Sequence, residues 1–186
     1  MRQKSNMRHA ISIPLSLIVG YSTFVLYNNA TNMDYKKNYV AADDFRNDRD
    51  EVLFARLIYG EARGESIEVK RAIADSVLNR AKKRKWFGDT LREIILKQKQ
   101  YSCFNEDDVN LKLIKDPLKY ENARVWNECL SVARETLRKD NADQSNGATH
   151  YYDNSIPKPK WAKNKSPVLT LSKRNKGKVI FYHLEH

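Results

Sequence analysis

The sequence is poor in the residues that build covalently stapled or metal-stabilised folds. Its 186 residues include only two cysteines, which exclude a disulfide-rich scaffold and a four-cysteine zinc site. The four histidines form no His-x-x-x-His or His-x-x-Glu pattern, so we expect no metal and no cofactor. Glycine and proline are also scarce, with six and five residues, and the mean hydropathy of −0.73 excludes a protein with many membrane spans.

Apolar and aromatic residues are plentiful by comparison. Hydrophobic residues make up 41% of the chain, and there are ten tyrosines and three tryptophans. This composition excludes an intrinsically disordered chain. The length fits one domain of 130–150 residues with a small appendage, which is large enough to fold without covalent staples.

The net charge of +11 is concentrated in two segments. Residues 1–33 carry three basic residues and no acid, and residues 154–178 carry eight basic residues and no acid, so the rest of the chain sums to zero. A basic segment favours anionic partners such as nucleic acid, acidic lipid or wall polymers, although lysines can also serve solubility alone. No nucleic-acid-binding motif is recognised, so we expect no nucleic-acid partner.

The N-terminal segments predict export. A basic stretch over residues 1–9 precedes an apolar run over 10–27, which predicts a signal-anchor helix with its N-terminus in the cytoplasm. A cleaved signal peptide and a buried helix remain alternatives. Residues 28–47 are polar and predict a linker, and residues 48–186 form the body.

The predicted export decides the compartment in which residues 48–186 fold and act. We expect it to face the periplasm or cell wall from the inner membrane, or to be secreted after cleavage or release. In an oxidising compartment Cys103 and Cys129 could form a disulfide, and two free buried cysteines are the alternative.

The body has a mainly helical pattern with a small β element. Apolar periodicity and caps predict helices, with Asp48 as an N-cap of the first, Ser66 of the second and Thr90 of the third. Two short β-branched and aromatic runs predict strands. The expected helices cover 49–62, 67–83, 90–96 and 120–138, and the expected strands cover 149–152 and 179–182.

One carboxylate stands out by its spacing. Leu53, Leu57 and Glu61 are four residues apart, so they share the apolar face of the first helix, and glycines at 60 and 64 permit a close approach there. Partial burial would raise the pKa of Glu61, and a rise of about 2 units takes roughly 2.7 kcal/mol. Such a carboxyl could protonate a glycosidic oxygen. A glutamate exposed to solvent, or one paired with a nearby arginine, is the alternative.

Six stretches resemble the cell wall hydrolase family of the spore cortex-lytic enzyme type. The resemblance extends over about residues 52–182, and two of the motifs, Glu-Ala-Arg-Gly-Glu and Gly-Ala-Thr-His-Tyr-Tyr, are specific in combination. The stretches are 57–65, 73–80, 100–103, 146–152, 159–162 and 177–182. Two segments depart from the family pattern at the rim of the expected groove. Lys178 and Val179 stand where the family usually has a histidine shortly after the glycine, and residues 97–99 stand where it often has a Gly/Pro-rich loop.

The resemblance implies both a fold and an activity. The fold would be α+β and mainly α, similar to goose-type lysozyme and lytic transglycosylases. The activity would be cleavage of peptidoglycan between N-acetylmuramic acid and N-acetylglucosamine, with Glu61 as the catalytic acid. A lytic transglycosylase needs this one glutamate and leaves a 1,6-anhydro end. A muramidase would use water and a second carboxylate, for which Glu65, Asp107 and Asp108 are candidates. A peptidoglycan-binding module without activity is a further alternative.

We expect other residues of these motifs to bind the glycan. Aromatic rings can stack on sugars, and amide and hydroxyl groups can bond acetamido groups, although such residues also serve as plain core. Glu65 could instead be an ion-pair residue. The expected substrate-binding residues are Glu65, Gln100, Tyr101, Ser102, Thr149, His150, Tyr151, Tyr152 and Trp161.

The expected partners follow from the same features. They are peptidoglycan strands, the inner membrane through residues 10–27, and anionic envelope polymers through residues 154–178. We expect a monomer that acts in cell wall lysis or remodelling. A bacteriophage endolysin would have this arrangement of a short anchor and one lytic domain.

Overall fold

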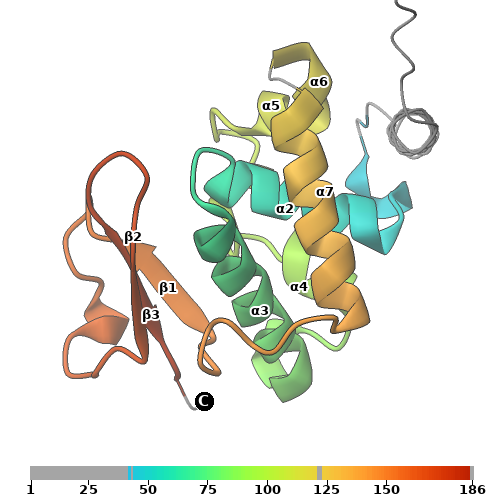
Figure 1. The fold of residues 1–186 in the computed structure, drawn as a ribbon. Coiled ribbons are helices and arrows are strands. Elements are labelled where there is room, and N and C mark those ends of the chain that lie inside the picture. The colour runs from blue at the N-terminus through green and yellow to red at the C-terminus, as the bar shows by residue number, and fades with distance from the viewer. Residues whose placement is uncertain (1–41, 43, 121–122, 185–186) are drawn as a thin grey trace, which may run out of the picture. The chain divides into compact units, whose positions relative to one another are not determined.

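The computed structural model describes residues 42, 44–120 and 123–184, which belong to one compact unit (Figure 1). The helix expected at 10–27 and most of the linker expected at 28–47 lie outside the described residues. Within the described ranges, no helix combines the length and apolar character that crossing a membrane requires.

The described residues form a mainly helical body and a small sheet, which confirms the expected mainly α composition. The α-helices are α2 (Asp50–Ala62), α3 (Ile67–Lys83), α4 (Leu91–Leu96), α5 (Leu111–Lys115), α6 (Pro117–Tyr120) and α7 (Ala123–Arg138). The strands are β1 (His150–Asp153), β2 (Leu169–Ser172) and β3 (Lys178–Tyr182). Short 3-10 turns lie at η1 (Phe45–Asn47), η2 (Lys85–Phe87), η3 (Ser102–Phe104) and η4 (Lys160–Ala162).

Helix α2 is the centre of the helical body. Every residue from Val52 to Tyr59 is buried, so the helix has no solvent-facing side along this stretch, unlike the one apolar face that the spacing predicts. It packs most extensively against α7 and also contacts α3, α4 and α5 (Figure 1). A helix buried all round needs partners for every polar side chain that it carries.

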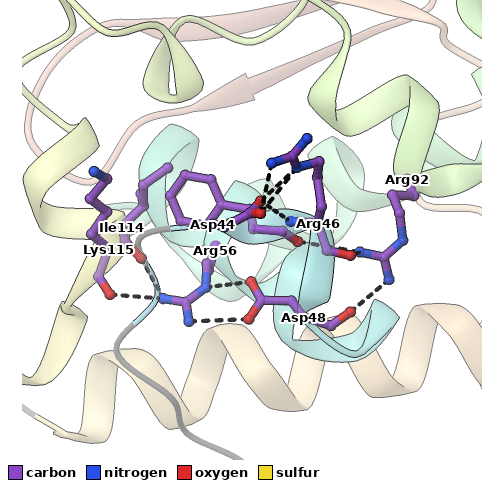
Figure 2. Close-up of polar contacts among 8 residues, drawn as sticks. Asp44, Arg46, Asp48, Arg56, Arg92, Ile114 and Lys115 are labelled. Atoms are coloured by element: carbon purple, nitrogen blue, oxygen red, sulfur yellow. Dashed lines mark hydrogen bonds and ion pairs between the residues drawn. The ribbon is translucent and has the colours of Figure 1, made fainter.

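The one charged residue inside this stretch of α2 has such partners. The Arg56 side chain is fully buried, and its Nε donates to Asp48 Oδ2 at 2.8 Å (Figure 2). Its Nη1 donates to the carbonyl oxygens of Ile114 at 2.5 Å and Lys115 at 3.2 Å, at the end of α5. The Arg56 guanidinium therefore links the segment before α2 to the end of α5.

A second arginine, Arg92 of α4, binds the same segment before α2. Arg92 Nη2 donates to the carbonyl oxygen of Asp48 at 2.6 Å, and its Nη1 donates to the carbonyl oxygen of Arg46 at 2.9 Å (Figure 2). Arg92 Nη2 also donates to Asp50 Oδ1 at 2.7 Å. The turn before α2 is thus held from two sides.

The capping predictions are confirmed in two helices and wrong in one. Ser66 accepts from the Val69 amide at 3.4 Å, and Thr90 accepts from the Glu93 amide at 3.1 Å. The predicted cap Asp48 does not cap α2: the helix begins after Arg49, which makes no side-chain cap bond. The Asp48 carboxylate is instead committed to Arg56, because a buried guanidinium requires a counter-charge.

The helix expected at 120–138 corresponds to α7 from Ala123 to Arg138, and Tyr120 belongs to α6. Trp126, Cys129 and Ala133 are buried as expected, whereas Ala123 is exposed. Cys103 and Cys129 are both buried and free, which decides between the two alternatives for the cysteines.

The sheet is antiparallel with the strand order β1-β3-β2. β1 pairs with β3 in the register Tyr151 to Phe181, and β2 pairs with β3 in the register Leu171 to Val179. Sequence patterns predicted β1 and β3 within one residue and missed β2. That strand is only four residues long and half exposed, so its alternation is hidden beside a lysine-rich loop.

One face of the sheet packs on the helices. Val179 and Phe181 are buried against a cluster that includes Ala62 of α2 and Val69, Ala72 and Ile73 of α3. The contact brings β1 beside the C-terminal end of α2, where Glu61 lies.

Replacing Arg56 with methionine should lower the free energy of unfolding by about 3–5 kcal/mol, because it leaves the Asp48 carboxylate and two carbonyl groups without their buried partner. Urea unfolding monitored by circular dichroism would measure the change. Arg46→Met is the matched control, since Arg46 and its partner Asp44 are exposed. A loss no larger than that of the control would show that Arg56 does not hold this segment.

Candidate active site

Glu61 lies in the last turn of α2, where α2 meets β1 and η3. The Tyr151 hydroxyl of β1 donates to Glu61 Oε2 at 3.0 Å. The thiol of Cys103, in η3, makes a second side-chain hydrogen bond to the same carboxylate. Three segments that are distant in sequence therefore meet at one carboxyl group.

Burial dominates the protonation of Glu61. Desolvation raises the pKa of Glu61 above its ordinary value, and the hydrogen bonds from Tyr151 and Cys103 oppose that rise only in part. The negative charge of Asp108 raises the pKa further, and the positive charge of Arg80 lowers it. The carboxyl group consequently keeps its proton to a higher pH than an exposed glutamate, as a general acid requires.

The neighbours of Glu61 remain neutral donors. Burial raises the pKa of the Tyr151 phenol and of the Cys103 thiol, and the nearby Glu61 charge raises both further. Both groups therefore carry their protons at neutral pH and can stabilise the Glu61 carboxylate once it has given up its own proton.

A glycine makes room for the Cys103 contact. A Cβ atom placed on Gly60 would lie 2.7 Å from both Cβ and Sγ of Cys103 and 3.0 Å from Cγ2 of Ile114. Gly64, by contrast, has no atom within 4 Å of such a position. The glycine beside Glu61 is thus required by close packing, and the one after the helix is not.

Arg80 of α3 is one of the nearby arginines that sequence reasoning offers only as a pairing partner of Glu61. It is buried, and its Nε donates to the carbonyl oxygen of Thr149 at 2.6 Å. The guanidinium lies over the rings of Phe87 and Tyr101, at 5.4 and 5.0 Å from their centroids. Arg80 therefore ties α3 to the start of β1 and places a positive charge near Glu61.

Two hollows of about 440 Å3 each adjoin this point. The first, which we call the acidic hollow, contains Glu61 itself. It is lined by Glu61, Glu65, Ile73, Ser102, Tyr151, Tyr152, Asp153, Ile156, Pro159, Trp161 and Val179. The second, which we call the cationic hollow, is lined by Arg80, Trp86, Lys97, Gln98, Lys99, Gln100, His150, Tyr151 and Trp161. The two hollows share Tyr151 and Trp161 in their walls, and only the acidic hollow contains Glu61.

Most of the expected substrate-binding residues line one of these hollows. The acidic hollow gathers Glu65, Ser102, Tyr151, Tyr152 and Trp161 around Glu61. The cationic hollow adds Gln100 and His150.

Thr149 and Tyr101 are buried instead and line neither hollow. The Thr149 hydroxyl accepts from the Leu184 amide at 3.2 Å, so it fixes the end of the sheet. Tyr101 packs under Arg80, where burial raises the pKa of its phenol.

Trp161 stands where the hollows meet. Its ring is 37% exposed and packs at centroid distances of 5.2 Å from His150, 6.1 Å from Tyr152 and 5.5 Å from Tyr182. An aromatic ring supported on one side and open on the other can stack on a sugar.

The carboxylates considered as partners of Glu61 differ in placement. Glu65 shares the acidic hollow, where Oε2 accepts from the Arg174 amide at 3.0 Å and Oε1 lies 3.8 Å from Lys173 Nζ. Asp107 is exposed and borders a separate hollow. Asp108 accepts hydrogen bonds from Asn110 and Ser102, which hold its pKa below the ordinary value against the opposing effect of burial.

The described ranges contain no group of three or more histidine, cysteine, aspartate or glutamate side chains arranged to hold a metal ion.

Glu61→Gln should stabilise the protein at neutral pH more than at pH 4. Because the pKa of Glu61 is raised in the folded protein, folding opposes the loss of its proton. The resulting cost in free energy grows as the pH rises from the ordinary value of 4.5 to the raised value, and it is fully present above that. Below pH 4.5 both states hold the proton, and the cost disappears. Urea unfolding at pH 4, 5, 6 and 7 would measure the difference between variant and wild type. Glu68→Gln, on an exposed position of α3, is the control for removal of a carboxylate. A difference for Glu61→Gln that stays flat with pH would contradict the burial of the charge.

Gly60→Ala should lower the free energy of unfolding by about 1–3 kcal/mol, because the new methyl group must displace Cys103. Gly64→Ala is the matched control and should change the stability little, since its methyl group enters open space. Thermal unfolding of both variants would measure the effect. Equal stabilities would mean that Cys103 moves aside freely.

The comparisons with known proteins agree with the motifs. The sequence model described as Cell Wall Hydrolase matches residues 64–182, a match that begins three residues after Glu61. A search of curated proteins found no significant match. Among solved structures, the crystal structure of the catalytic domain of the Bacillus cereus SleB protein is similar, with a TM-score of 0.45 and 21% identity, covering 71% of this chain and 88% of that one. Because the family match spans most of the body, the chain belongs to the cell wall hydrolase family, whose name denotes enzymes that degrade the peptidoglycan wall.

Proposed function

We propose that the protein is a lytic transglycosylase that cleaves peptidoglycan between N-acetylmuramic acid and N-acetylglucosamine, with Glu61 as its only acid and base. The observation that carries the proposal is the position of Glu61: a carboxyl group with a raised pKa, held by Tyr151, in a hollow that shares Tyr151 and Trp161 with a second hollow. A glycan strand is a linear substrate that would occupy both hollows at once.

The proposed reaction has two proton transfers. Protonated Glu61 donates its proton to the glycosidic oxygen, the bond from that oxygen to the muramoyl C1 breaks, and positive charge develops at C1. The muramoyl C6 hydroxyl then attacks C1, and the Glu61 carboxylate takes the hydroxyl proton. The products are a 1,6-anhydromuramoyl end and a free N-acetylglucosamine hydroxyl, no water is consumed, and Glu61 is protonated again.

The neighbours of Glu61 suit its charged intermediate state. While Glu61 is ionised, the Tyr151 hydroxyl and the Cys103 thiol donate to it, and Arg80 supplies a nearby positive charge. These interactions limit the rise of the Glu61 pKa, so that the group can release its proton as well as hold it.

Hydrolysis by water is the second candidate, and Glu65 is the residue that favours it. Glu65 lies in the same hollow as Glu61 and could act as a base toward water. Its two oxygens are, however, already engaged by the Arg174 amide and by Lys173. With both oxygens held by these contacts, the carboxylate is less free to turn toward a water molecule, which supports the mechanism with one carboxylate.

The proposed location completes the function. In this proposal residues 10–27 tether the enzyme to the inner membrane, facing the periplasm or cell wall, or are lost on secretion. Lysines of the 154–178 segment, such as the exposed Lys163 and Lys165, bind anionic envelope polymers. The protein acts as a monomer in wall lysis or remodelling, as a bacteriophage endolysin does.

Mass spectrometry of glycan fragments tests the proposal. Full-length wild-type protein should release 1,6-anhydromuramoyl ends from purified peptidoglycan, and Glu61→Gln should lower the rate by about 100- to 10,000-fold because the acid is lost. Glu65→Gln should leave anhydro ends as the product. Glu68→Gln, which removes an exposed carboxylate outside both hollows, is the control.

Two results would overturn this proposal in different ways. Reducing ends that disappear in both Glu61→Gln and Glu65→Gln would establish a muramidase that uses both carboxylates. Sacculi that bind the wild-type protein and yield no fragments would establish a binding module.

A further inference from the structure

The two hollows beside Glu61 differ in charge. The acidic hollow has Glu65 and Asp153 in its wall, and Lys173 contacts both of these carboxylates. The cationic hollow has three basic residues, Arg80, Lys97 and Lys99, and no acidic residue in its wall. A bound anion would therefore find its counter-charges in the cationic hollow.

The two lysines of the cationic hollow have charges available for a ligand. Lys97 and Lys99 are exposed, and among residues 44–120 and 123–184 neither forms an ion pair with a carboxylate. Lys97 and Lys99 also border a further hollow, which contains Glu106 and Asp107, but no ion pair joins either lysine to these acids in the part of the chain that the structure describes. Arg80, in contrast, is buried and committed to the Thr149 carbonyl, so it contributes a fixed positive field.

The loop that carries these lysines has an unusual backbone. Lys99 has a positive φ of 63°, in the left-handed region that non-glycine residues rarely occupy. Such a conformation costs free energy and is found most often where a loop serves binding. The ammonium group of Lys97 lies 4.9 Å from the ring centroid of Trp86, which is 48% exposed. The loop therefore presents two positive charges beside an aromatic ring that is partly exposed and stacks on Phe87.

Peptidoglycan offers an anion that fits this arrangement. Its glycan backbone of acetylated sugars is uncharged, and its carboxylates lie on the peptides that branch from the muramoyl residues. From the charges and exposed ring of the cationic hollow, we infer that Lys97 and Lys99 bind the carboxylates of a muramoyl peptide, with Trp86 packing against the same peptide. This inference rests on the proposed function, and it makes the peptide-bearing strand, rather than the bare glycan, the preferred substrate.

Binding measurements on the inactive protein test the inference separately from catalysis. Full-length Glu61→Gln protein would be titrated by calorimetry with glycan fragments that carry uncross-linked peptides, and with the same fragments after an amidase has removed the peptides. We expect about 5- to 20-fold tighter binding of the peptide-bearing fragments at low salt, because two exposed charge pairs are made. Raising the ionic strength should reduce this preference.

The lysine variants assign the preference to the hollow. Adding Lys97→Gln and Lys99→Gln to the Glu61→Gln protein should abolish the preference. The pair Lys112→Gln and Lys119→Gln, at exposed positions of α5 and α6, removes the same charge outside the hollow and should retain it.

Equal binding of the two kinds of fragment would overturn the inference, and so would a preference that survives the Lys97 and Lys99 changes. Neither result depends on cleavage. A wild-type protein that cleaves no peptidoglycan would overturn the proposed function alone, because the difference in binding is measured without turnover.

Discussion

The fully buried guanidinium of Arg56 is the charge that the helical body must accommodate. It lies in the middle of a helix with no solvent-facing side, so each of its polar contacts has to come from the protein. Asp48 supplies the counter-charge and α5 supplies two carbonyl oxygens, which fixes the segments on both sides of α2. Because these contacts hold α2 in place, they also fix the position of Glu61 in its last turn.

The same central position explains the protonation of Glu61. An exposed helix end would leave the carboxyl group in water, whereas here β1 and η3 close over it and contribute Tyr151 and Cys103. Desolvation raises the pKa of Glu61, and the two donors together with Arg80 restrain the rise. The balance suits a group that must both give and take a proton within one reaction. Gly60 makes the closure possible, because any side chain there would collide with Cys103.

The sheet adds side chains to the site around Glu61. β1 carries His150, Tyr151 and Tyr152, and its pairing with β3 sets these side chains along the junction of the two hollows. Trp161 adds the exposed ring between them. The two hollows differ in charge, since the acidic hollow has Glu65 and Asp153 in its wall and the cationic hollow has no acidic residue.

Local sequence determined the long helices α2 and α3 and the caps Ser66 and Thr90, because apolar spacing and capping act within a few residues. The family motifs supplied the expected site residues, most of which line the hollows. Local sequence could not give the short strand β2, the use of Asp48 as a counter-charge, or the role of Arg80 beside Glu61. Those depend on groups brought together from distant segments, as when Arg80 of α3 meets the Thr149 carbonyl. The burial that sets the pKa of Glu61, and the separation of acidic from cationic surroundings, were decided by the tertiary structure alone, because desolvation and charge pairing are properties of the packed chain.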